Sequence, residues 1–181
     1  MTTIRQTPQT SSATLEGLLA WFDGYVAALP DSDKNLIQTA FDLAKEHYPA
    51  DALTTYGEPL LEHFLGSMQI VSELDLLPDA VAATILSDIG KYVPTWHELV
   101  TERCNSTVCE LVKGVDEVQK LTQFARVDSL ATPEERGQQA ETMRKMLLAM
   151  VTDIRVVLIK LAMRTRTCLL YTSDAADDLT R

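Results

Sequence analysis

Few residues of this chain belong to the types that bind metals or transfer protons, and their spacing limits the chemistry open to them. Asp88 stands in the stretch TILSDIGKYV, residues 84–93, which has the pattern of an amphipathic helix. Of the three histidines, His47 and His97 have no partner at the spacing of metal ligands, so we predict that both lie on helix surfaces. His63 is also isolated, and a single histidine rarely holds a metal ion. A buried histidine with a polar partner is its simpler interpretation.

Other common chemistries find no support in the sequence. The three cysteines, Cys104, Cys109 and Cys168, are odd in number and have no CxxC spacing, which favours reduced thiols and a cytoplasmic protein. A zinc site at Cys104 and Cys109 would need two further ligands nearby, and none is found. The motifs GxSxG, GxxxxGK[ST] and GxGxxG are absent, so neither a serine nucleophile nor a glycine-rich phosphate loop is expected.

Composition narrows the class of protein further. The chain has 181 residues, of which 46% are hydrophobic and 23% charged, as in a folded globular domain. Its formal net charge of −10 repels a phosphate backbone, so direct nucleic-acid binding is not expected. The polar start of the chain does not resemble a signal peptide. No hydrophobic run approaches the roughly 20 residues that cross a bilayer, so no membrane association is expected.

The hydrophobic residues recur at helical spacing, and no segment alternates convincingly with a period of two. Glycine and proline, seven of each, are sparse and fall mostly between the helical runs. The pattern predicts an all-α fold of about seven or eight helices, with no internal repeat. The predicted helical runs cover residues 15–29, 36–44, 60–71, 81–89, 95–104, 106–124 and 139–167.

Two of these runs carry further signals. Gly114 lies inside the run 106–124 and is expected to weaken it by about 1 kcal/mol relative to alanine. The run 139–167 has one hydrophobic stripe, which we assign to the core. That stripe consists of Met143, Met146, Leu147, Met150, Ile154, Val157, Leu158 and Leu161.

Both ends of the chain differ from the middle. Residues 1–13 are rich in Thr, Ser and Gln and are predicted to be disordered. Residues 168–181, CLLYTSDAADDLTR, resemble a translated sequencing adapter. We interpret them as the scar of a cut gene fragment and exclude them from the fold. The predicted domain therefore covers residues 14–167 and is truncated at its C-terminal end.

Three stretches, in this order, resemble the long RelA/SpoT-type proteins that make and degrade the alarmone (p)ppGpp. GEPLLEH, residues 57–63, is similar to the GEPYIxH of their N-terminal HD hydrolase domain. LVKGVDEVQKL, residues 111–121, is similar to LVDGVTKL. The run 139–167 is the most specific, because it contains IKLAMR where the family has IKLADR. The resemblance implies an HD-domain-like helical bundle over roughly residues 36–167.

In the family, a Mn²⁺-like ion lies among a histidine, a His-Asp pair and a distant aspartate, and a Glu-Asp pair assists hydrolysis. The resemblance places the metal ligands at His63, Ser87, Asp88 and Met163. It places the assisting pair at Lys91 and Tyr92, and an Arg-Lys pair that helps to hold the nucleotide at Thr54 and Thr55. Most of these positions have therefore lost the family's residue types.

The replacements oppose both metal binding and proton transfer. A serine hydroxyl is a poor ligand, a methionine thioether prefers soft ions, and the charge of Lys91 repels a dication. A tyrosine phenol, with an ordinary pKa of about 10, does not replace a carboxylate at neutral pH. Asp88 and Lys91 are three residues apart on a predicted helix, which favours a surface ion pair.

The resemblance thus implies a catalytically inactive HD pseudo-hydrolase region of a RelA-like GTP pyrophosphokinase. We expect no cofactor, and a regulatory role toward a synthetase domain of the same parent protein that is missing from this chain. Two alternatives stay open. One is an active Mn²⁺-dependent phosphohydrolase that uses His63, Asp88 and a further acid such as Glu62 or Glu117. The other is a free-standing helical interaction module.

Overall fold

The computed structural model describes residues 14–74, 76–126, 144 and 153–178. These residues form seven α-helices and one 3-10 helix, with no β-strand among them, which confirms the predicted all-α fold. The elements are α1 (Leu15–Ala27), α2 (Asp31–His47), α3 (Leu60–Glu73), α4 (Pro78–Ile85), η1 (Ile89–Lys91), α5 (Trp96–Arg103), α6 (Ser106–Arg126) and α8 (Ile154–Asp178).

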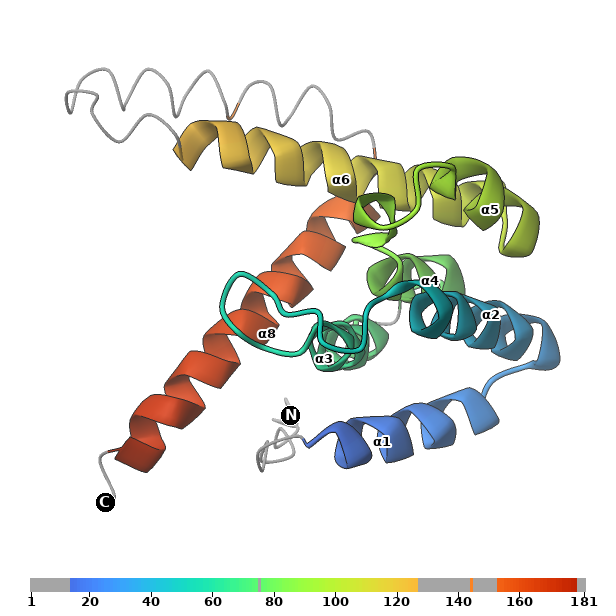
Figure 1. The fold of residues 1–181 in the computed structure, drawn as a ribbon. Coiled ribbons are helices and arrows are strands. Elements are labelled where there is room, and N and C mark those ends of the chain that lie inside the picture. The colour runs from blue at the N-terminus through green and yellow to red at the C-terminus, as the bar shows by residue number, and fades with distance from the viewer. Residues whose placement is uncertain (1–13, 75, 127–143, 145–152, 179–181) are drawn as a thin grey trace, which may run out of the picture.

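The short helix α4 lies at the centre of the bundle. It packs against α2, α3, α6 and α8, and every side chain from Ala80 to Ile85 is buried. Helix α3 contacts both α1 and α8, while α5 packs on α6 (Figure 1). Small residues such as Ala82 and Ala83 allow this close packing on several sides at once. The turn that follows α4 is therefore held in the interior of the domain.

Local sequence explains where the first helices begin. Thr14 caps α1, because its side-chain oxygen accepts a hydrogen bond from the backbone N–H of Gly17 at 3.3 Å. The N-cap of α2 is Pro30, and no side chain caps the helix there. Asp31 and Asp33 lie in the first turn of α2, where their negative charges interact favourably with the positive end of the helix dipole.

The predicted helical run 81–89 is interrupted after Ile85. The buried hydroxyl of Tyr48 donates a hydrogen bond to the carbonyl oxygen of Ile85 at 2.7 Å, which ties up the end of α4. The Ser87 hydroxyl donates to the carbonyl oxygen of Ala83 at 3.0 Å, a local bond that competes with the helical ladder. Burial, and secondarily the charge of Asp88, raises the pKa of Tyr48 well above its ordinary value. The prediction of one continuous helix was therefore wrong.

Helix α8 buries a different face from the predicted one. Ile154 and Leu161 are 66% and 57% exposed, whereas Val156, Ile159 and Ala162 are buried. The buried face can approach its neighbours closely because it meets glycines. A Cβ atom at Gly114 would lie 2.7 Å from Val156 Cγ2, and one at Gly66 would lie 2.6 Å from Arg166 Nε. Gly114 is thus required by helix packing, which the sequence pattern alone did not indicate.

We expect Gly114→Ala to lower the free energy of unfolding by about 1 kcal/mol net. Overpacking costs about 1–3 kcal/mol, of which the better helix propensity of alanine offsets about 1 kcal/mol. Urea denaturation followed by circular dichroism measures the change. The matched control is Gly24→Ala in α1, where no atom lies within 4 Å of the added Cβ. That control should gain stability, and equal gains in the two variants would contradict the packing role of Gly114.

Several sequence predictions concern residues outside the described ranges. They are the disordered N-terminus 1–13 and the core role of Met143, Met146, Leu147 and Met150. Helix α8 continues across residues 167 and 168 to Asp178 without a break, so the adapter origin of 168–181 stays a prediction from sequence alone.

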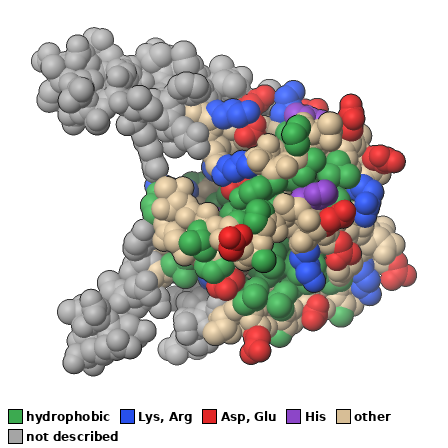
Figure 2. All heavy atoms as spheres, viewed as in Figure 1, with side chains coloured by type: hydrophobic (Ala, Val, Ile, Leu, Met, Phe, Trp, Pro, Cys, Tyr) green, Lys and Arg blue, Asp and Glu red, His purple; other side chains and the backbone are tan. Residues whose placement is uncertain are grey.

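The outer surface is mixed in character. On the face shown in Figure 2, acidic and basic side chains are interspersed along one edge, and hydrophobic side chains are visible between them. None of the helices in the described part of the chain is long and apolar enough to span a membrane.

Candidate functional site

The loop between α2 and α3 positions the first candidate residues. Thr54 and Glu58 close the loop. The Thr54 N–H donates to the Glu58 carbonyl oxygen at 2.8 Å, and the Glu58 N–H donates to Thr54 Oγ1 at 3.2 Å. Gly57, with a φ of 84°, supplies the left-handed turn between them. The Thr54 hydroxyl therefore maintains the loop, while Thr55 is exposed beside it.

His63 belongs to a buried three-residue network. Its Nδ1 lies 2.7 Å from Glu58 Oε2, and the other carboxylate oxygen of Glu58 accepts hydrogen bonds from Arg166 Nε at 2.9 Å and Nη2 at 2.8 Å. All three residues are at most 9% exposed. The predicted buried histidine with a polar partner is confirmed, whereas the roles of Glu58 and Arg166 were not predicted.

The two other histidines lie apart from this network. His97 is exposed and stacks on the ring of Trp96 at 3.7 Å, and His47 is half-buried at the end of α2. Glu62 lies beside Glu58, and burial together with the Glu58 charge raises the pKa of Glu62. In the described structure, Glu58 is the polar side chain that contacts the His63 ring, and Arg166 holds the other oxygen of that carboxylate.

Asp88 is held by a second polar network. Its Oδ2 accepts a hydrogen bond from Lys91 Nζ at 2.6 Å, and its Oδ1 accepts one from Gln119 Nε2 at 3.4 Å. Gln119 Oε1 in turn accepts a hydrogen bond from Lys160 Nζ at 3.0 Å. The Asp88–Lys91 pair was predicted, but its placement on a helix surface was wrong. Asp88 is buried, and the pair spans the turn and η1 because α4 ends early.

Lys160 is the cation of α8 that points to this network. Burial lowers the pKa of Lys160, the charge of Asp88 acts in the opposite direction, and the charges of Lys91 and Arg164 lower the pKa further. The charge of Asp116 also acts to raise it, so burial is the main cause of the lowered pKa of this amine.

One face of α8 joins the two networks. Lys160, Met163 and Arg166 follow each other at intervals of three residues, which places them along one side of the helix. Lys160 reaches Gln119 and Arg166 reaches Glu58, so the buried Met163 lies between the two networks. The remaining positions from the sequence are Ser87, whose buried hydroxyl bonds the backbone, and Tyr92, whose ring lies 5.4 Å from that of Tyr48.

The comparison with known protein families agrees with this arrangement. A family model described as an HD domain matches residues 40–180 of the chain. The chain belongs to the HD-domain family. This HD domain is 31% identical over 137 residues to the bifunctional (p)ppGpp synthase/hydrolase SpoT of Escherichia coli K12. That alignment covers 76% of the chain and 18% of the relative.

Two further relatives are named as kinases. The HD domain is 38% identical over 136 residues to the GTP pyrophosphokinase of Myxococcus xanthus, covering 75% of the chain and 17% of the relative. It is 30% identical over 162 residues to a probable GTP pyrophosphokinase of Mycobacterium leprae, covering 88% and 19%. The resemblance to RelA/SpoT-type proteins is thus confirmed, and the chain spans less than a fifth of the length of these relatives.

The side chains of this HD domain do not fit the divalent ion that the family resemblance implies. Asp88 already has the ammonium group of Lys91 against one oxygen, and the Ser87 hydroxyl is directed to a backbone carbonyl. The thioether of Met163 has little affinity for a hard cation. Across the described residues, no three His, Cys, Asp or Glu side chains gather where one ion could be held.

The cysteines of the HD domain are free thiols at all three positions. Burial raises the pKa of Cys104 to about 11. Because a thiolate, not a thiol, binds zinc, this shift disfavours a metal role for Cys104 at neutral pH.

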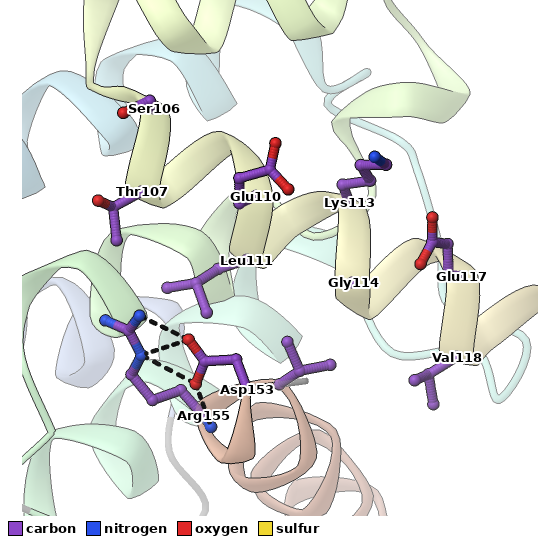
Figure 3. Close-up of a pocket in the computed structure, with 11 residues that line it drawn as sticks. Ser106, Thr107, Glu110, Leu111, Lys113, Gly114, Glu117, Val118, Asp153 and Arg155 are labelled. Carbon is purple, nitrogen blue, oxygen red and sulfur yellow. Dashed lines mark hydrogen bonds and ion pairs between the residues drawn. The ribbon is translucent and has the colours of Figure 1, made fainter. Parts of the chain in front are cut away.

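A cavity of about 460 Å³ lies elsewhere in the HD domain, between α6 and the start of α8 (Figure 3). Asp153 and Arg155 line one side of it. The Arg155 side chain donates to Asp153 at 2.6–3.0 Å, which lowers the pKa of Asp153. Glu117 lines the opposite side from α6. His63, Ser87, Asp88 and Met163 do not border this cavity, so it is distinct from the two polar networks. Of the acids named for the active alternative, Glu117 borders the cavity and therefore faces away from this set of positions.

Proposed function

We propose that this HD domain is a pseudo-hydrolase, the region of a RelA-like GTP pyrophosphokinase that has lost (p)ppGpp hydrolysis. The observation that carries the proposal is the 2.6 Å contact between Lys91 Nζ and Asp88 Oδ2. A lysine ammonium group supplies the positive charge beside a buried carboxylate that a divalent ion would otherwise supply. Bringing a dication to Asp88 would require Lys91 to leave, because two like charges cannot share that contact at low cost.

The positions needed for proton transfer support the same conclusion. At the two positions where the family has a Glu-Asp pair, Lys91 is engaged with Asp88 and Tyr92 is partly exposed beside Tyr48. Neither side chain is a carboxylate that could accept a proton from an attacking water molecule. Loss of metal ligands and loss of the base thus occur together.

The proposed role of the domain is regulatory, toward a synthetase domain of the parent protein. The support is that the bundle keeps an intact core while α8 presents apolar side chains outward. Ile154 and Leu161 are 66% and 57% exposed along that helix. An exposed apolar helix face is typical of a surface that contacts another domain. Relatives named as a synthase/hydrolase and as pyrophosphokinases agree with such a partner.

Manganese titration with a parallel hydrolysis assay tests the proposal. We expect isothermal calorimetry of the 181-residue chain with MnCl2 to show no saturable binding, because no open ligand set is present. Incubation with ppGpp and Mn²⁺ should release no pyrophosphate, measured by anion-exchange chromatography. The E. coli synthase/hydrolase serves as the positive control. Binding in the micromolar range, or release of pyrophosphate by the chain, would favour the active metal phosphohydrolase instead.

A further inference from the structure

We infer that the former catalytic centre now works as a clasp that fixes the position of α8, with Gln119 as its positioning residue. The clasp consists of Lys160, Gln119, Asp88 and Lys91. It links three elements that are far apart in the sequence: α8, α6 and the turn with η1. The inference rests on the proposed function, because a divalent ion at Asp88 would displace Lys91 from the clasp.

The chemistry of the two neighbours explains why a glutamine is needed at position 119. Lys160 can only donate hydrogen bonds, and the ionised carboxylate of Asp88 can only accept them. A side-chain amide meets both demands at once: Oε1 accepts from Lys160 at 3.0 Å, and Nε2 donates to Asp88 at 3.4 Å. This pairing also fixes which way the amide points. A carboxylate at 119 would repel Asp88, and an apolar side chain would leave both neighbours without this partner.

The position of the clasp along α8 gives it a mechanical role. Near its start, α8 is held by the contact of Val156 with Gly114. Beyond Lys160, the helix is held again by the pair of Arg166 with Glu58. The clasp lies between these two anchors and links α8, through Gln119, to the turn after α4. Breaking it should free the middle of α8 and that turn while the rest of the bundle stays packed.

Hydrogen–deuterium exchange of the full 181-residue chain, read by mass spectrometry, tests the clasp. In Gln119→Met, which keeps side-chain length but makes no hydrogen bonds, we expect amides of residues 154–167 and 86–92 to exchange about tenfold faster. Amides of α2 should be unaffected. The matched control is Gln38→Met, because the bond that the Gln38 amide makes in the described structure is local, to Asp42 within α2 at 3.1 Å. This control should leave α8 unchanged.

Gln119→Glu separates a clasp from a general packing role. The new carboxylate still accepts from Lys160, but it repels Asp88, so exchange should rise at 86–92 while α8 keeps most of its protection. If Gln119→Met does not fold, Lys160→Met removes the same hydrogen bond from the α8 side and takes its place. Unchanged exchange in α8, or an equal rise in every helix, would overturn the inference.

The same exchange experiment distinguishes failure of the clasp from failure of the proposed function. Wild-type chain is measured with and without MnCl2. A manganese-dependent change in exchange at 86–92 would contradict the loss of metal binding, whatever the Gln119 variants show. Unaltered exchange in the Gln119 variants would contradict the clasp but would not contradict the proposed loss of hydrolysis.

Discussion

Replacing Arg166 with leucine is expected to lower the free energy of unfolding by about 3 kcal/mol. The Arg166 and Glu58 side chains are each 7% exposed, and their contacts of 2.8–2.9 Å are made out of reach of water. Removing the guanidinium leaves the Glu58 carboxylate buried, with His63 at 2.7 Å as its remaining side-chain partner among the described residues. An incompletely compensated buried charge is among the few causes of losses this large. Urea denaturation of the purified chain, followed by circular dichroism, measures the difference.

Arg164 offers a matched control for this prediction. It lies two residues earlier on α8, is exposed, and bonds the hydroxyl of Tyr56 at 3.2 Å. Because a solvent-exposed contact contributes little, Arg164→Leu should change stability by no more than about 0.5 kcal/mol. Equal losses in the two variants would show that Arg166 acts through general helix effects. A double variant with Glu58→Gln should lose less than the sum of the single losses, since the two residues share one interaction.

The helices of this domain could be predicted because each buries a stripe of hydrophobic side chains at helical spacing, as α1 does with Leu18, Phe22 and Val26. Two features could not be predicted in this way. The break after Ile85 depends on the hydroxyl of Tyr48, which lies 37 residues earlier and meets Ile85 only in the folded state. The buried face of α8 was misassigned because both faces carry apolar residues. Gly114, on another helix, decides which face is buried.

The candidate site also contains residues that the sequence predicted and residues that it did not. The family resemblance located Asp88 and His63 from local motifs, and the spacing of Asp88 and Lys91 predicted their contact. The partners Glu58 and Arg166 are separated by 108 residues, and no periodic pattern links them. The three-residue interval from Met163 to Arg166 was a weak signal that the same face of α8 continues into a polar contact. Long-range polar pairs of this kind depend on the tertiary fold.

Introducing the family's residue types at three of the changed positions should produce metal binding. In the triple variant Ser87→His, Lys91→Glu, Met163→Asp, we expect a manganese dissociation constant of about 1 μM by calorimetry, against no binding by the wild-type chain. The variant removes the ammonium group from Asp88 and adds one imidazole and two carboxylates, which are suitable ligand types for Mn²⁺. Position 163 lies on the α8 face between Lys160 and Arg166, so the new carboxylate would face the former centre.

The melting temperature of the same triple variant provides a second test. Without metal, a carboxylate at the buried position 163 is desolvated, and its neighbours Lys160 and Arg166 are already bonded to Gln119 and Glu58. The melting temperature should therefore fall below that of the wild type. Manganese should then raise it, because an ion that binds only the folded state stabilises that state. Met163→Asp alone is the control. Its melting temperature should fall, but manganese should not raise it again, since Lys91 is still paired with Asp88. If the triple variant folds but does not bind manganese, the backbone around Asp88, and not only the side chains, differs from the geometry of a metal site.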